Sequence, residues 1–118
     1  MATVLIADDA AFMRMRSVSL LEELGHEVLE AEDGQQAVEI YQEKRPDAVL
    51  LDITMPVMDG LEALKEIMKH DPNAKVAMVT AMGQQQVIME AIKAGAKDFV
   101  VKPFDGDRIQ EALWKLIG

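Results

Sequence analysis

Three carboxylates in this sequence stand where a short apolar run ends. Asp8 and Asp9 follow Thr3–Ala7, and Asp52 ends the run Ala48–Asp52. Carboxylates that share a pocket repel one another unless a cation lies between them, and Mg²⁺ prefers such oxygen ligands. A carboxylate beside a bound metal can attack phosphorus and form an aspartyl phosphate. We therefore predict a Mg²⁺-dependent phosphoryl site with Asp52 as the acceptor.

A hydroxyl and an ammonium group stand at the ends of two further runs. Thr80 follows Lys75–Val79, and Lys102 follows Asp98–Val101 with Pro103 directly after it. A transferring phosphoryl group spreads negative charge over its equatorial oxygens, which an ammonium and a hydroxyl can neutralise or hydrogen-bond. We predict these two roles for Lys102 and Thr80.

The metal ligands follow from the same placement. We predict that Asp9 and Asp52 bind Mg²⁺ directly and that Asp8 binds it through water, because Mg²⁺ keeps several of its waters. The backbone carbonyl of Thr54 could supply a further ligand. The small side chain of Ala81, directly after the hydroxyl, leaves room for a phosphoryl group.

Five strand-like and five helix-like segments alternate, which predicts a parallel sheet with helices on both faces. Nearly continuous apolar runs start at Val4, Ala48 and Val76 and indicate central strands. Charged runs at Glu27 and Lys97 indicate edges. With right-handed crossovers these assignments favour the order 2-1-3-4-5 of flavodoxin-like folds. We predict an α/β fold, a single doubly wound (βα)5 domain, whose strand ends bring the reactive side chains to one edge.

Helical spacing of apolar residues predicts the helices and their buried faces. We expect helices over 10–24, 35–44 and about 107–117, one after Gly60, and one that ends at Gly95. The predicted inward residues are Met13, Leu20, Leu21 and Leu24; Ala37, Ile40 and Tyr41; Leu61, Leu64, Ile67 and Met68; Ile88, Ala91 and Ile92; Ile109, Ala112, Leu113 and Leu116. Trp114 and Ile117 then lie to the side of the last helix, where we favour local packing over a partner surface.

Composition restricts the function classes. At 118 residues, half of them hydrophobic, the chain is one folded domain over residues 1–118. A net charge of −9 argues against nucleic-acid binding, and no apolar run is long enough to span a bilayer. The absence of cysteine excludes a disulfide framework and a thiolate metal site. We expect a cytoplasmic protein, without a signal peptide, that acts as a monomer.

The motifs that contain the reactive residues resemble those of a known protein family. Asp8-Asp9, Asp52, Thr80-Ala81 and Lys102-Pro103 are similar to the receiver domains of two-component response regulators, in order and along the whole chain. Three stretches resemble stand-alone chemotaxis regulators of the CheY type more closely, namely 8–15, 81–85 and 95–99.

This resemblance implies a phosphorylation-activated signalling switch. A histidine kinase would donate the phosphoryl group to Asp52, and the receiver would catalyse only its own phosphorylation and slow dephosphorylation. It further implies a cis Lys102–Pro103 bond. Phosphorylation would pull Thr80 inward and move Phe99 toward the interior.

The changed output face would comprise the fourth helix, the fifth strand and the fifth helix. An output protein, a flagellar switch component in a chemotaxis pathway, would bind there, and a phosphatase could act on the phosphorylated form. Thr54 and Met82 occupy positions that vary across the family and tune the phosphoryl lifetime.

Other functions compete with this hypothesis. A phosphatase with an aspartyl nucleophile would need a second acid where Thr54 stands. A flavin carrier on the same fold would need a glycine- and hydroxyl-rich phosphate loop after the first strand, and more aromatic residues than 4% of the chain. A receiver cut or engineered from a larger regulator, and a receiver-like binding module that accepts no phosphate, remain open alternatives.

Overall fold

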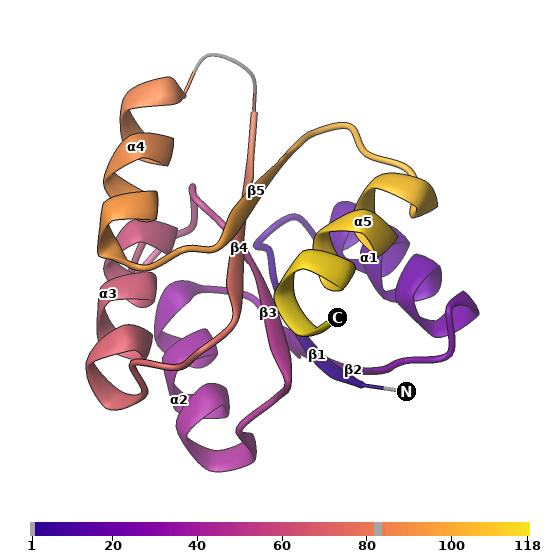
Figure 1. Ribbon diagram of the computed structural model, residues 1–118, viewed down its shortest axis with the longest axis horizontal. Helices are drawn as coiled ribbons and strands as arrows, with labels where there is room; N and C mark the ends of the chain where they lie inside the picture. Colours follow the sequence, from indigo (N-terminus) through magenta and orange to yellow (C-terminus); the bar gives the residue numbers. More distant parts are fainter. Residues whose placement is uncertain (1, 82–83) are drawn as a thin grey trace.

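The chain forms one five-stranded parallel sheet flanked by five helices (Figure 1). This computed structural model describes residues 2–81 and 84–118, so the position of Met82 lies outside the described residues. The strands are β1 (Thr3–Ala7), β2 (Glu27–Ala31), β3 (Ala48–Asp52), β4 (Val76–Thr80) and β5 (Asp98–Val101). The helices are α1 (Ala11–Glu23), α2 (Gly34–Lys44), α3 (Gly60–His70), α4 (Gln85–Ala94) and α5 (Gly106–Ile117).

The strand order is β2-β1-β3-β4-β5, which confirms the predicted topology. The two strands that begin with a charged residue, β2 and β5, lie at the edges, and the three more apolar strands lie between them. Among the strands, β4 differs in its bounds from the sequence prediction, because it begins at Val76 rather than Lys75 and includes Thr80. Thr80 therefore pairs with Val101 inside the sheet instead of following the strand.

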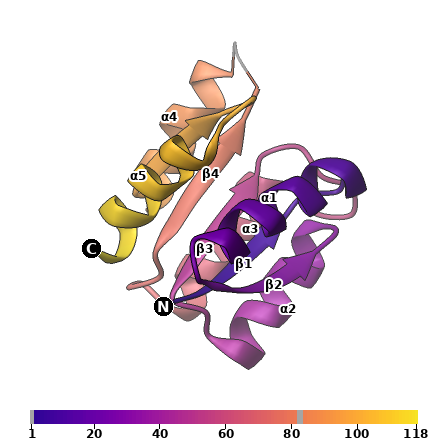
Figure 2. The same cartoon turned by 90° about the vertical axis from the view of Figure 1, so that its right-hand side faces the viewer.

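Two hydrophobic clusters cover the two faces of the sheet. Alternate residues of a strand point to opposite faces, so Leu50 of β3 packs beneath α1 and α5 while Leu51 packs beneath α2, α3 and α4. Figure 2 shows α1 and α5 together on one side of the sheet. The central strands are buried on both faces, which explains their nearly unbroken apolar sequence.

The helix ends are fixed by side chains and glycines that the sequence identifies. Asp33, Asp59 and Asp105 each accept a hydrogen bond from a backbone N–H in the first turn of α2, α3 and α5, at 2.8–3.0 Å. Gly25 and Gly95 follow α1 and α4 with positive φ angles of 90° and 120°, as expected for glycines that end helices.

Two predictions of side-chain direction are wrong. Ile92 of α4 was expected to face inward but is 49% exposed, because α4 packs on its neighbours through Ala91 and the residues one turn before it. Trp114 of α5 was expected to pack locally but is 71% exposed. Leu113 borders the buried stripe of α5 on one side, and the next residue lies about 100° further round the helix, outside that stripe.

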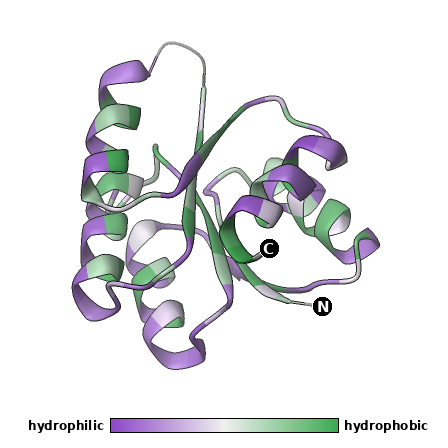
Figure 3. Ribbon diagram, in the orientation of Figure 1, coloured by the Kyte–Doolittle hydropathy of each residue, from purple (hydrophilic) through white to green (hydrophobic). Residues whose placement is uncertain are grey.

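The hydropathy pattern agrees with this division of the helices. In Figure 3 the green, apolar sides of the helices face the sheet and their purple sides face outward. His26 is half-buried, and its Nδ1 accepts a hydrogen bond from the Ala2 N–H at 3.1 Å. In the part of the chain that the structure describes, no helix is long and apolar enough to cross a membrane.

Helices α2 and α3 are joined at their C-terminal ends, away from the strand ends with the reactive side chains. The Tyr41 hydroxyl donates a 2.7 Å hydrogen bond to Asp71 Oδ2, and Arg45 lies 3.2 Å from the same oxygen. The hydrogen bond from Tyr41, with a second one from the Asn73 N–H, holds the pKa of Asp71 below its ordinary value. Burial and the Asp71 partner raise the pKa of Tyr41.

We expect Asp71→Asn to lower the free energy of unfolding by about 1 kcal/mol at neutral pH. A carboxyl whose pKa is lower in the folded state stabilises the fold above its unfolded-state pKa of about 4, and this contribution disappears as the pH falls through the folded-state pKa. Urea unfolding of both proteins across this pH range measures the difference. A difference that stays constant down to the lowest pH would contradict the assignment.

Candidate functional site

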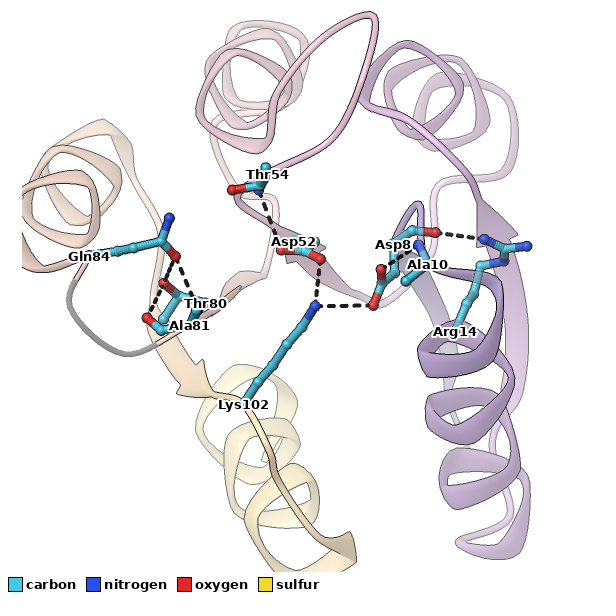
Figure 4. Close-up of polar contacts among 9 residues, drawn as sticks. All are labelled: Asp8, Ala10, Arg14, Asp52, Thr54, Thr80, Ala81, Gln84 and Lys102. Atoms are coloured by element: carbon cyan, nitrogen blue, oxygen red, sulfur yellow. Dashed lines mark hydrogen bonds and ion pairs between the residues drawn. The ribbon is translucent and has the colours of Figure 1, made fainter.

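The predicted site residues meet at the carboxyl edge of the sheet (Figure 4). Asp52 is the last residue of β3, Thr80 the last of β4, and Asp8 and Lys102 directly follow β1 and β5. Since these four strands are parallel neighbours, the register places their ends side by side, with Ala7 opposite Leu51 and Thr80 opposite Val101. The fold thus converts residues far apart in sequence into one cluster.

The three carboxylates form a group that could hold a metal ion. Asp8, Asp9 and Asp52 each offer one oxygen, and these oxygens lie within 4.8 Å of one another. Asp8 and Asp52 are buried, whereas Asp9 is exposed at the mouth of the cluster. An all-oxygen donor set with an open side suits a cation such as Mg²⁺, which retains waters.

Lys102 bridges two of the acids. Its Nζ lies 2.7 Å from Asp52 Oδ2 and 3.4 Å from Asp8 Oδ2. Figure 4 shows the side chain reaching between the two carboxylates. The Lys102–Pro103 peptide bond is cis, as the resemblance implied, and the backbone N–H of Lys102 donates to the Thr80 carbonyl at 2.8 Å.

Burial and the nearby charges shift the pKa values of this pair. Burial raises the pKa of Asp52, and the hydrogen bond and charge of Lys102 offset only part of that effect. Burial acts to lower the pKa of Lys102, but the hydrogen bond and charge of Asp52 outweigh it, so the pKa of Lys102 lies above its ordinary value. The ammonium group therefore supplies a positive charge beside the candidate acceptor.

Thr80 is fully buried, and its hydroxyl contacts Gln84 rather than the acids. The Thr80 Oγ1 donates to Gln84 Oε1 and also lies 3.0 Å from the Ala81 carbonyl oxygen. Within residues 2–81 and 84–118, no hydrogen bond joins Thr80 to Asp52. The sequence does not predict this role of Gln84, because nothing in the run Gln84-Gln85-Gln86 distinguishes its first member.

Thr54 and Phe99 lie at the margins of the site. Thr54 is exposed, and its N–H is 3.4 Å from Asp52 Oδ1, a long contact. Phe99 is 36% exposed in a groove between α4 and β5, where Ile88, Met89 and Ile92 also lie. The structure thus places Phe99 outside the core, while its proposed movement stays a prediction.

Two further residues that the sequence does not single out help to position the site. Arg14 of α1 donates from Nη1 to the Asp8 carbonyl at 2.7 Å and pairs with Glu30 at 3.1 Å and Glu32 at 3.5 Å. Gly60 begins α3 directly against the strand end, and a β-carbon there would overlap the Asp52 carbonyl oxygen. Arg14 thus holds the turn that carries Asp8, and Gly60 lets α3 pack onto the residue before the β3–α3 loop.

A sequence profile described as the response regulator receiver domain matches residues 4–114. The chain belongs to the response regulator receiver family. Among curated relatives, the chemotaxis protein CheY of Thermotoga maritima is 59% identical over 114 residues, which is 96% of this chain and 95% of that protein. Sporulation initiation phosphotransferase F of Bacillus subtilis is 38% identical over 114 residues, covering 97% and 92%.

Solved structures of receiver proteins have the same fold. The CheY of a CheX–CheY–BeF₃–Mg²⁺ complex from Borrelia burgdorferi matches with a TM-score of 0.92 and 36% identity, covering 98% of this chain and 89% of that one. NtrX of Brucella abortus matches with a TM-score of 0.93 and 33% identity. This chain spans only 26% of the NtrX chain, so the likeness there is to one part of a longer protein.

We expect Mg²⁺ to raise the melting temperature of the wild type by about 5 °C at ten times its dissociation constant, because a ligand bound only to the folded state stabilises it. In Asp9→Asn this increase should be largely lost. Asp107→Asn, an exposed acid in the first turn of α5, serves as the control and should keep it. Equal Mg²⁺-dependent shifts in the wild type and Asp9→Asn would contradict the ligand assignment.

We expect Gly60→Ala to lower the free energy of unfolding by about 1–3 kcal/mol, because the new methyl group must displace the backbone at Asp52. Alanine normally stabilises a helix relative to glycine by up to about 1 kcal/mol. Gly106→Ala at the start of α5 is the matched control, since its β-carbon would meet only Leu20 at an ordinary 3.7 Å. Urea unfolding should separate the two variants, and equal effects would contradict this account of Gly60.

Proposed function

We propose that this receiver is a signalling switch that accepts a phosphoryl group on Asp52 from a histidine kinase. The observation that carries the proposal is the meeting of Asp52 with two further acids and with Lys102, 2.7 Å away, at one sheet edge. Family membership supports the same chemistry, because the reactive residues stand at the positions that the resemblance assigns to it.

In the transfer step, the protein forms one covalent bond, at Asp52. A carboxylate oxygen of Asp52 forms a bond to phosphorus while the P–N bond of the donor phosphohistidine breaks. The bonding electrons leave on the imidazole nitrogen, which takes a proton from solvent. Lys102, whose Nζ is 2.7 Å from Asp52 Oδ2, then lies where it can neutralise one of the phosphoryl oxygens.

Asp8, Asp9 and Asp52, with the Thr54 carbonyl, would hold Mg²⁺. The bound ion would screen the acids from one another and from the incoming phosphoryl group. Return to the resting state follows attack of water on phosphorus: the new O–P bond forms as the bond to Asp52 breaks, which restores the carboxylate and releases phosphate. Beyond this self-directed chemistry we propose no enzymatic activity.

The output would be read on the surface of α4, β5 and α5. Thr80 would turn toward the phosphoryl group and Phe99 would move inward from its exposed place in the groove beside α4. Arg108 of α5 donates a 2.6 Å hydrogen bond to the Phe99 carbonyl, so a movement of β5 at this residue would reach α5.

The relatives favour a chemotaxis pathway. Because this chain is 59% identical to a CheY over nearly its whole length, we propose a flagellar switch component as its output partner. One of the similar structures is a complex of CheX with CheY, which supports a second protein partner, and we propose that this partner is a phosphatase. The protein would act as a monomer, and both the protein and its kinase would lie in the cytoplasm.

Incubation with Mg²⁺ and a small acyl-phosphate donor should give a phosphoryl adduct by intact mass in the wild type, because the pocket itself carries the groups for transfer. The adduct should be absent in Asp52→Asn and after chelation of Mg²⁺. Asp59→Asn, an exposed acid in the same loop region, should still form it.

Each negative result has a distinct meaning. An adduct of equal yield in Asp52→Asn would place the acceptor elsewhere. No adduct in any protein, with Mg²⁺ binding confirmed separately, would identify a receiver-like binding module that accepts no phosphate. Asp52-dependent turnover of a small phosphate ester would instead favour the phosphatase hypothesis.

A further inference from the structure

The side-chain amide oxygen of Gln84 accepts hydrogen bonds from two donors on the β4 side of the site. Its Oε1 accepts from the Thr80 hydroxyl and, at 3.0 Å, from the Ala81 backbone N–H. Figure 4 shows the Thr80 hydroxyl turned toward Gln84, while Lys102 and the acids lie on the other side. One oxygen atom therefore engages the hydroxyl and the N–H at the end of β4.

These contacts exclude a simultaneous contact with a phosphoryl group. A hydroxyl carries one proton and a backbone N–H carries one, so each can make only one strong donation at a time. Thr80 is fully buried, and among the described residues its hydroxyl contacts two acceptors, Gln84 Oε1 and, at 3.0 Å, the Ala81 carbonyl oxygen. A phosphoryl oxygen on Asp52 could bind either donor only after that donor has left Gln84.

Gln84 does not serve its own helix. It stands directly before α4, at the N-cap position, yet its side chain makes no capping hydrogen bond to the first turn. The side chain reaches back along the chain instead, to Thr80 and Ala81. It also borders the groove that contains Ile88 and Phe99, so it touches both the site and the proposed output surface.

We propose that Gln84 is a positioning residue that holds the Thr80 hydroxyl and the Ala81 N–H away from Asp52 in the resting state. This inference rests on the proposed function, because it concerns the donors that would bind the phosphoryl group. Release of both donors is then part of activation, and any change in the groove that moves the Gln84 side chain alters the phosphoryl site.

Removing the amide oxygen should favour the phosphorylated arrangement. Gln84→Met keeps the length of the side chain but has no strong acceptor, and one hydrogen bond changes an equilibrium by about two- to tenfold. We expect the initial rate of phosphorylation by a small acyl-phosphate donor, and the affinity for BeF₃⁻ with Mg²⁺, to rise by about that factor. Gln84→Glu restores an oxygen acceptor and should return both values to the wild-type level or below.

Two controls separate positioning from general structure. Gln86→Met makes the same chemical change at an exposed position of α4 and should behave as wild type. In a Thr80→Ala background, Gln84→Met should lose much of its effect, because one of the two donors that it releases is gone. Hydrogen exchange of the Ala81 amide, measured by NMR without phosphoryl donor, should quicken in Gln84→Met and not in Gln86→Met.

The outcomes are distinguishable. If the wild type neither reacts with the phosphoryl donor nor binds BeF₃⁻, the proposed function is wrong, and this inference is wrong with it. Wild type that reacts, together with Gln84→Met of equal rate and affinity, would overturn the role of Gln84 alone. The same holds if the effect of Gln84→Met persists in full without the Thr80 hydroxyl.

Discussion

Repulsion among three carboxylates is the constraint on which the rest of the structure depends. Asp8 and Asp52 are buried at the ends of β1 and β3, which pair in the middle of the sheet and cannot move apart. Burial and the Asp8 charge both act to raise the pKa of Asp52. The positive charge of Lys102 offsets this repulsion in the resting protein. In the same position it could neutralise the negative charge that a phosphoryl group would bring. A site built this way favours an added cation and an added anion together.

The scaffold links this electrostatic cluster to the surface through a few polar contacts. The Lys102 N–H binds the Thr80 carbonyl, the Thr80 hydroxyl binds Gln84 before α4, and Arg108 of α5 binds the carbonyl of Phe99 on β5. These contacts run between neighbouring strands and the helices that follow them. The end of β4 is therefore connected to α4 and β5 within a few residues.

Much of the fold could be predicted from the sequence, because the information is local. Unbroken apolar runs identify strands buried on both faces, and polar residues such as Glu27 identify edge strands. The side of a helix that is left uncovered depends on its neighbours, and for that reason Ile92 and Trp114 were assigned wrongly. The clustering of site residues followed from strand ends alone. The role of Gln84 could not be predicted, because it depends on the direction of its side chain. The sequence alone does not distinguish Gln84 from Gln85 and Gln86.

A crystal structure with Mg²⁺ and BeF₃⁻ would test the central claim most directly, because it shows every group of the site at once. The account predicts beryllium bonded to an Asp52 carboxylate oxygen, Mg²⁺ between the three acids, and the fluorides in contact with Lys102, Thr80 and the Ala81 N–H. It also predicts that Gln84 has left Thr80. Beryllofluoride bound away from Asp52, or Mg²⁺ bound without Asp9 and Asp52, would contradict the account.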